Sequence, residues 1–184
     1  MRLFAALPLP SPARDEVTGV LGRLRAGPLP VRWVSGDGLH LTLKFYGEVS
    51  ADRLDVIAEA VRAAGEGGEA LPLRLTELGA FPSPSRARVV WVGVEAPPAL
   101  ELLQDRLERR SEAIGFEPEG VPFRPHVTLG RVREGHRCRL GEVERAAGEY
   151  EQVPFLATDL VLYESVADKG RSRYEPRLTV ELGA

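Results

Sequence analysis

Two similar hexapeptides, HLTLKF at 40–45 and HVTLGR at 126–131, constrain this chain more than any other feature. Apolar and polar residues alternate through most of each, and a period of two is typical of a β-strand with one buried face. The chain has only three histidines and six threonines, yet each hexapeptide has a threonine two residues after a histidine. Chance produces such a pair in about 0.3% of sequences of this composition, so we interpret the two strands as parts of one site.

Strand alternation separates the side chains of each hexapeptide into two faces. The polar face of the first strand is expected to carry His40, Thr42 and Lys44. Its other face is expected to enter a core through Leu41, Leu43 and Phe45. In the second strand the polar face carries His126, Thr128 and Gly130, and the core face carries Val127 and Leu129. Each strand therefore presents an imidazole and a hydroxyl side by side on an apolar backing.

Two imidazoles across a cleft are suited to general acid–base catalysis near neutral pH, because histidine titrates near pH 6.5. The threonine hydroxyls can donate hydrogen bonds to an oxyanion held between the two histidines. A phosphodiester is a substrate that needs such a pair, since one histidine activates a nucleophile while the other protonates the departing oxygen. This chemistry requires no metal ion. In the alternative interpretation, each histidine is a polar residue at a sheet edge, hydrogen-bonded to a nearby threonine.

The rest of the chain mixes strands and helices without a regular parallel alternation. Strands are expected at 2–7, 31–34, 39–47, 71–81, 88–95, 124–132, 155–166 and 174–182. Helices are expected at 11–24 with Ser11 as N-cap, from Ser50 to Gly65, at 97–115 and around 139–147. This order predicts an α+β protein with two mainly antiparallel sheets and flanking helices. The motifs lie 86 residues apart, which suggests two similar lobes related by a pseudo-two-fold axis.

Composition narrows the possible partners and the compartment. The net charge of −3 argues against indiscriminate binding of nucleic acid by the whole surface, so any anion site must be local. No apolar run approaches the roughly 20 residues that span a bilayer, and MRLFAALPLP at the start reads as a strand rather than a signal peptide. A lone cysteine, Cys138, excludes an internal disulfide and fits the cytoplasm.

Other candidate residues receive simpler interpretations. His136, in REGHRCR, has no threonine two residues on and is expected in a solvated loop. A zinc site formed by His126, His136 and Cys138 matches no known ligand spacing, so no metal site is expected. Trp33 and Trp91 lie in apolar strands and are expected in the core.

The two hexapeptides resemble the paired HxTx signatures of the 2H phosphoesterases. Within that superfamily the chain is most similar to the bacterial and archaeal group named for 2′-5′ RNA ligase, also described as RNA 2′,3′-cyclic phosphodiesterase. LGAFPSPSRARVVWVGV (78–94) and LYESVADKGRSRYEP (162–176) look like further family segments. The resemblance covers essentially the whole chain. It implies one domain over 1–184, with motifs at 40–43 and 126–129 in two lobes and the active cleft between them.

The resemblance also implies the reaction, in which a 2′,3′-cyclic phosphate at an RNA end opens to a 2′-phosphate and the 3′ oxygen leaves. His126 would be the base that activates water and His40 the acid, although their near-symmetry leaves the reverse assignment open. Thr42 and Thr128 would hold the phosphate oxygens, and Arg131 would reach the phosphate. Ligation would be the reverse type of reaction, with a 5′-hydroxyl as nucleophile. We expect no cofactor, since the chain lacks a GxxxxGK[ST] loop.

Three weaker candidates each have an ordinary alternative. Lys44 is either a substrate contact or a surface charge, and Arg131 is either a phosphate contact or a solvent-facing side chain. Phe81 either stacks on a base or packs in the core. For the whole protein, the expected partners are RNA ends bearing 2′,3′-cyclic phosphate, tRNA fragments among them, bound by a monomer. The alternatives are a phosphodiesterase of small cyclic nucleotides and an RNA-end-binding module without turnover.

Overall fold

The computed structural model describes residues 1–168 and 171–183, so two positions of the 162–176 segment lie outside the described residues. The strands are β1 Arg2–Pro8, β2 Val31–Trp33, β3 His40–Glu48, β4 Leu71–Ser83, β5 Arg86–Glu95, β6 His126–Val132, β7 Pro154–Ala157, β8 Asp159–Asp168 and β9 Arg171–Glu181. The helices are α1 Ala13–Ala26, α2 Leu54–Gly65, α3 Pro98–Ala113 and α4 Leu140–Ala147. Short 3₁₀ turns occupy Gly36–Gly38 and Ala51–Arg53.

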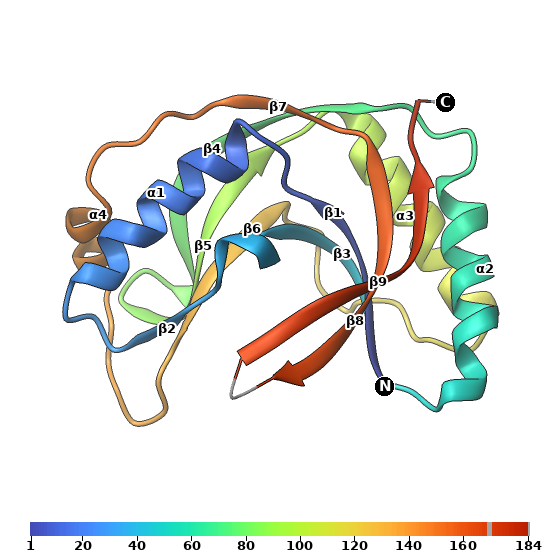
Figure 1. The fold of residues 1–184 in the computed structure, drawn as a ribbon, viewed down its shortest axis with the longest axis horizontal. Coiled ribbons are helices and arrows are strands. Elements are labelled where there is room, and N and C mark those ends of the chain that lie inside the picture. The colour runs from blue at the N-terminus through green and yellow to red at the C-terminus, as the bar shows by residue number, and fades with distance from the viewer. Residues whose placement is uncertain (169–170, 184) are drawn as a thin grey trace.

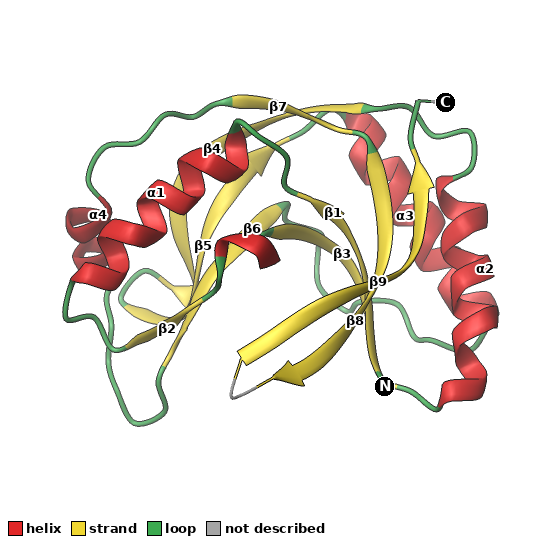
Figure 2. Cartoon of the chain, viewed as in Figure 1, coloured by secondary structure: helices red, strands yellow, loops and turns green. Residues whose placement is uncertain are grey.

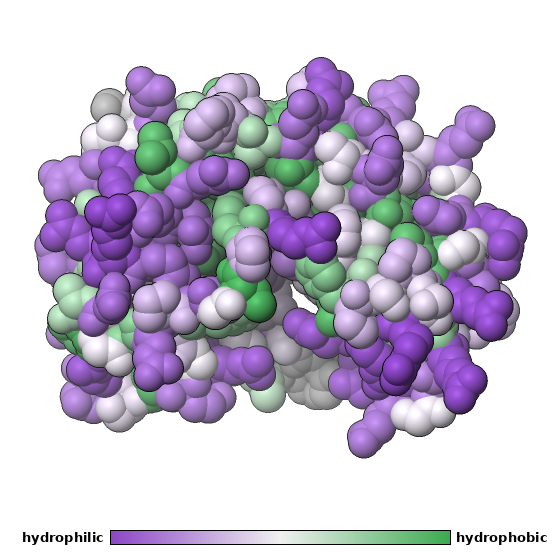
Figure 3. Space-filling view, turned by 180° about the vertical axis from the view of Figure 1, so that it is seen from behind, coloured by the Kyte–Doolittle hydropathy of each residue, from purple (hydrophilic) through white to green (hydrophobic). Residues whose placement is uncertain are grey.

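Helices flank the sheet in two pairs at opposite ends of the molecule (Figure 1). At one end α1 packs against α4 and β2, and at the other end α2 packs against α3, β8 and β9. The strands run between these ends (Figure 2), and the surface seen from behind is hollowed between the two halves (Figure 3). This arrangement confirms the predicted α+β class and the two similar lobes.

Within the described residues the strands follow the order β7-β4-β5-β6-β3-β1-β8-β9, with β2 alongside β6. Neighbouring strands are antiparallel. The two motif strands, β3 and β6, are central neighbours whose register pairs Leu41 with Val127. The two sheets expected from the sequence are therefore joined into one continuous sheet at this pair. No described helix is long and apolar enough to cross a bilayer.

The predicted helices form where apolar residues recur at helical spacing, but their first turns differ from the prediction. Ser11 is not the N-cap of α1; Pro12 takes that position, without a side-chain cap. The backbone explains this, since the N–H groups of Arg14 and Glu16 donate to the carbonyls of Pro10 and Pro12. The second helix begins at Leu54 rather than Ser50, after the 3₁₀ turn.

A register shift interrupts β3 at its motif. Opposite β1, Ala6 pairs with Thr42 and Ala5 pairs with Lys44, so Leu43 has no opposite residue. Such a β-bulge places two consecutive residues against one partner and reverses the alternation beyond it. Lys44 is consequently 3% exposed and Phe45 is 48% exposed. The predictions that Lys44 shares the face of His40 and that Phe45 enters the core are therefore wrong.

The second motif strand contains the same bulge at the corresponding leucine. Opposite β5, Trp91 pairs with Thr128 and Val90 pairs with Gly130, which leaves Leu129 without an opposite residue. From its histidine onward, β6 shows the same sequence of buried and exposed residues as β3. The pseudo-two-fold symmetry thus extends to the irregularity in each strand, and Arg131 stands where β3 has Phe45.

Gly130 lies where another strand approaches closely. A Cβ atom at this position would lie 2.7 Å from both Trp33 Cε3 and Val31 Cγ1, and 2.9 Å from the backbone oxygen of Arg32. The backbone oxygen cannot rotate away as a flexible side chain can. Only glycine therefore lets β2 pair with β6 at this register.

We predict that Gly130→Ala destabilises the protein by about 1–3 kcal/mol, the usual cost of overpacking. Gly22→Ala on the exposed side of α1, where an added Cβ meets nothing within 4 Å, should instead stabilise by about 0.4–1 kcal/mol. Urea unfolding of both variants and the parent measures the two changes. Equal stability of Gly130→Ala and the parent would contradict the close approach.

Candidate active site

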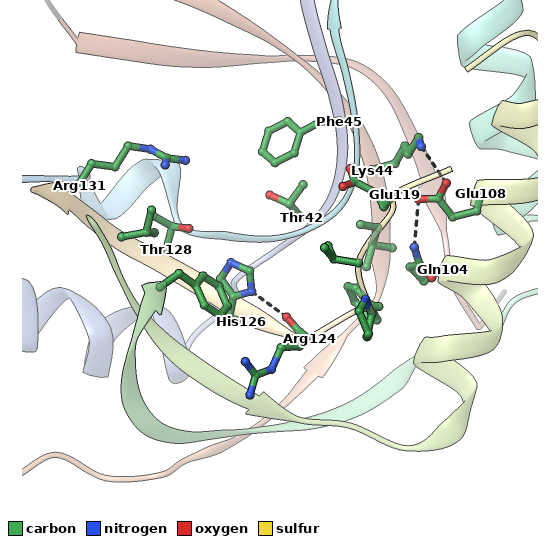
Figure 4. Close-up of a pocket in the computed structure, with 16 residues that line it drawn as sticks. Thr42, Lys44, Phe45, Gln104, Glu108, Glu119, Arg124, His126, Thr128 and Arg131 are labelled. Carbon is green, nitrogen blue, oxygen red and sulfur yellow. Dashed lines mark hydrogen bonds and ion pairs between the residues drawn. The ribbon is translucent and has the colours of Figure 1, made fainter. Parts of the chain in front are cut away.

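A cavity of about 830 Å³ lies beside the two motif strands (Figure 4). Six of the seven predicted site residues line it: Thr42, Lys44, Phe81, His126, Thr128 and Arg131. The seventh, His40, is not part of this lining and packs among aromatic side chains. The hydroxyl groups of Thr42 and Thr128 point toward each other across the cavity in Figure 4.

The register of β3 and β6 explains why the histidines and threonines come together. Antiparallel strands that pair Leu41 with Val127 have opposite residues whose numbers sum to a constant. One residue away on either side, His40 therefore stands across from Thr128, and Thr42 stands across from His126. All four side chains share a face, opposite to that of the buried Leu41 and Val127.

His126 is held in one tautomer by its own chain. Its Nδ1 lies 2.7 Å from the carbonyl oxygen of Arg124, and since a carbonyl can only accept, Nδ1 carries the proton. The lone pair of the neutral ring is then on Nε2, which faces the open space near Thr42 and Thr128 in Figure 4. Phe81 packs edge-to-face against this imidazole, with 5.1 Å between ring centroids.

His40 has the same hydrogen bond in a more enclosed setting. Its Nδ1 lies 2.7 Å from the carbonyl oxygen of Gly38, so it also carries the proton there. Phe4 and Tyr174 surround the ring at centroid distances of 4.8 and 5.2 Å. This aromatic surrounding orients the imidazole and leaves it only partly exposed to solvent.

Burial lowers the pKa of both histidines. For His40, burial lowers the pKa to about 4, the hydrogen bond to Gly38 opposes the shift, and the charge of His126 adds to it. For His126, burial again lowers the pKa, with further lowering by the charges of Arg131 and Arg124. Both imidazoles are therefore neutral at neutral pH without substrate. A bound phosphate would raise both pKa values, because its negative charge favours the protonated ring.

The ammonium group of Lys44 is already paired within the protein. Its Nζ lies 2.7 Å from Glu108 Oε2 and 2.7 Å from the carbonyl oxygen of Glu117, so it is neither a surface charge nor a free contact. Phe45, which the sequence assigned to the core, instead lines the cavity. The bulge at Leu43 causes both changes, and no spacing in the sequence signals it.

Phe81 and Arg131 both line the cavity. Phe81 is half-buried between His126 and Trp91, and Arg124 lies over its ring at 5.8 Å, so it supports the histidine as well as bounding the cavity. Arg131 is exposed on the cleft face. Trp91, expected in the core, is half-buried and also packs near His126, at 5.9 Å between centroids.

His136 lies in the exposed loop that the sequence predicted. Its Nδ1 contacts the carbonyl oxygen of Glu134 there. Trp33 packs against the core as a partly buried side chain, and Cys138 is buried. In the part of the chain that the structure describes, no three metal-binding side chains are grouped to hold an ion.

The comparisons with known proteins agree with this geometry. A family model described as LigT like Phosphoesterase matches residues 7–91 and again residues 92–174, once for each half and each motif. RNA 2′,3′-cyclic phosphodiesterases of Methanothermobacter thermautotrophicus and Aeropyrum pernix are 36% and 41% identical to this chain. The alignments cover 83% and 82% of this chain, and 82% and 88% of those relatives. The crystal structure of E. coli LigT complexed with 3′-AMP superposes with a TM-score of 0.77 at 29% identity, over 100% of this chain and 98% of that one.

Two lobes that each carry a histidine–threonine strand, facing a shared cavity, define the class of two-histidine phosphoesterases. The family model covers most of the chain, and the two relatives share well over 30% of their aligned residues with it. The chain belongs to the LigT-like phosphoesterase family.

The low pKa of His40 predicts how stability depends on pH. In the unfolded chain His40 titrates at 6.5 and in the fold at about 4, so below pH 6.5 the unfolded state binds the proton more tightly. Stability should fall as the pH drops through this range, by roughly 3 kcal/mol from His40 alone.

Urea unfolding of the parent and of His40→Gln between pH 7.5 and 3.5 tests this prediction. The difference in stability between the two proteins should change steadily between pH 6.5 and 4 and then level off. A difference that stays constant over this range would show that His40 titrates normally in the fold.

Proposed function

We propose that this protein hydrolyses RNA 2′,3′-cyclic phosphate ends to 2′-phosphomonoesters by metal-independent acid–base catalysis. One observation carries the proposal. The same strand occurs twice, and each copy places a neutral imidazole beside a threonine. The register of the two strands sets each histidine across from the threonine of the other strand. The names of the relatives, RNA 2′,3′-cyclic phosphodiesterases in both organisms, support the choice of substrate. We treat residues 1–184 as one domain of two lobes.

In the proposed reaction His126 is the base, because it lines the cavity directly and Arg124 directs its proton to Nδ1. Its Nε2 takes a proton from water while the water oxygen bonds to phosphorus. The bond from phosphorus to the 3′ oxygen breaks, and His40, which is protonated at Nε2 once the bound phosphate has raised its pKa, donates that proton to the oxygen. After the reaction His126 has gained a proton and His40 has lost one. Proton exchange of both histidines with solvent restores the starting state.

The threonines stabilise the charge that develops in this step. Thr42 and Thr128 direct hydroxyl groups across the cavity, where they can donate to the non-bridging phosphate oxygens. Arg131, exposed at the cavity beside this pair, supplies the local positive charge that the net charge of −3 does not. A phosphate held there also raises the pKa of His40 and so prepares it to act as an acid.

The same residues would catalyse 2′-5′ ligation if a 5′-hydroxyl replaced water as the nucleophile. We further propose that the protein acts as a monomer on RNA ends in the cytoplasm, with tRNA fragments among its substrates. A phosphodiesterase limited to small cyclic nucleotides would turn over a cyclic mononucleotide but not an oligonucleotide end. A binding module without turnover would release no product in a single-turnover assay.

Replacing either histidine tests the assignment. We predict that His40→Ala and His126→Ala each lower kcat on an oligonucleotide with a 2′,3′-cyclic phosphate end by about 10²–10⁴-fold. His136→Ala, at the exposed histidine of the loop, is the matched control and should retain full activity. Steady-state kinetics with a fold check by circular dichroism measures this. Full activity in either of the first two variants would contradict the proposed pair.

The threonines should contribute through the transition state rather than through substrate affinity. Thr42→Val and Thr128→Val keep the size of the side chain and remove the hydroxyl donor, so we predict a loss of about 10–10³-fold in kcat with a smaller change in KM. A rise in KM with unchanged kcat in both variants would show that the hydroxyl groups serve binding alone.

Catalysis by two imidazoles should not depend on a metal ion. We predict that prolonged dialysis against EDTA leaves kcat within about twofold of its starting value, because proton transfer supplies the catalysis. The control is the same protein dialysed without chelator. Loss of activity that returns on adding a divalent cation would overturn the proposed mechanism.

A further inference from the structure

A segment of the chain forms one wall of the cavity and is held mainly by hydrogen bonds from side chains that lie outside the segment. Residues 117–123 follow α3 and lead into β6, and the part from Glu119 to Phe123 lines the cavity. Val121 is 70% exposed within it. Among the described residues, the hydrogen bonds that involve 117–124 run from Lys44 Nζ to the carbonyl of Glu117 and from His126 Nδ1 to the carbonyl of Arg124.

These two anchors come from the two motif strands. Lys44 lies two residues after Thr42 on β3, and it fixes the start of the segment. His126 opens β6 and fixes the end, together with the N–H of Val94, which donates to the carbonyl of Pro125 at 3.1 Å. The wall of the cavity is therefore tied to the same strands that carry the histidines and threonines, so a change in one anchor alters the shape of the cavity.

The Lys44 anchor is buried and charge-balanced. Lys44 is 3% exposed, and a buried ammonium group persists only when a partner neutralises it. Glu108 of α3 supplies that charge at 2.7 Å, and Gln104 donates to its other oxygen at 3.1 Å. Figure 4 shows these three side chains together at the α3 side of the cavity. With the carboxylate already paired, the Lys44 bond to the Glu117 carbonyl serves to hold the segment.

The corresponding segment of the other lobe is held in a different way. Gly130 occupies the position of Lys44 in β6, and because it has no side chain, β2 pairs directly with β6 there. The motif strands are thus alike where the phosphate would bind and different one residue beyond the bulge. The wall formed by residues 117–123 lies on the α3 side of the cavity. The nucleoside part of a substrate held by the histidines and threonines therefore meets a surface on this side that differs from the surface on the other side.

We propose that Lys44 is a positioning residue, which holds residues 117–123 as the wall against which the nucleoside part of the substrate binds. This inference rests on the proposed function for its substrate. Without the Lys44 bond the segment spends part of its time away from the cavity, and the apparent affinity falls by the fraction of time it is in place. The histidines and threonines are unchanged, so kcat is preserved.

The test compares Lys44→Met, Lys44→Arg and the double variant Lys44→Met/Glu108→Gln with the parent. The double variant removes the buried charge left behind on Glu108, so it keeps the test valid if Lys44→Met folds poorly. Arg109→Met is the matched control, because it removes an ion pair with Asp105 on an exposed face of the same helix. Each protein is assayed with an oligonucleotide that ends in a 2′,3′-cyclic phosphate and by hydrogen–deuterium exchange of residues 117–123.

In the double variant we expect faster exchange across 117–123 and a rise in KM on the order of tenfold, as for a wall in place one tenth of the time, with kcat within about twofold. Lys44→Arg should restore much of the parental KM, and Arg109→Met should match the parent. If the double variant has the same hydrogen–deuterium exchange and the same KM as the parent, the inference is overturned. A loss of kcat without a change in KM would also overturn it. If the parent itself fails to turn over the substrate, the proposed function fails, while exchange alone still decides whether Lys44 holds the segment.

Discussion

The pairing of Leu41 with Val127 at the centre of the sheet is the constraint on which the site depends. Both side chains are buried, so the two strands cannot slip by one residue without turning their apolar faces to solvent. The same register places each histidine across from the other strand's threonine. Packing in the core therefore sets the geometry of the polar face.

The second constraint is the bulge that each motif strand contains at its last leucine. Before the bulge the two strands present the same residues, which serve the symmetric part of the reaction. Beyond the bulge the two strands differ. Phe45 of β3 corresponds in position to Arg131 of β6, and the buried Lys44 corresponds to Gly130. A phosphodiester with a nucleoside on one side is itself asymmetric, so these differences are suited to orienting it. The shared residues carry the proton transfers.

Much of this arrangement could be predicted from the sequence because it depends on local periodicity. Most strands, the helices, the shared face of His40 and Thr42, and the face of His126 and Thr128 follow from spacing. The single strand expected at 155–166 is wrong, because the chain forms β7 beside β4 and then β8 between β1 and β9. The positions of Lys44 and Phe45 could not be predicted, since a bulge depends on pairing with β1 rather than on the residues of β3 alone. The joining of the two sheets and the contact of Lys44 with Glu117 are likewise long-range and leave no periodic signal.

The central claim is that two imidazoles on opposite sides of a cyclic phosphate transfer protons so that the 3′ oxygen leaves. The most direct test is to incubate the protein with an oligonucleotide that ends in a 2′,3′-cyclic phosphate and to identify the product isomer by phosphorus NMR. The account predicts a 2′-phosphate as the product. A 3′-phosphate would mean that the 2′ oxygen leaves and would contradict the proposed orientation of the substrate, and an unchanged cyclic end would contradict the proposed activity.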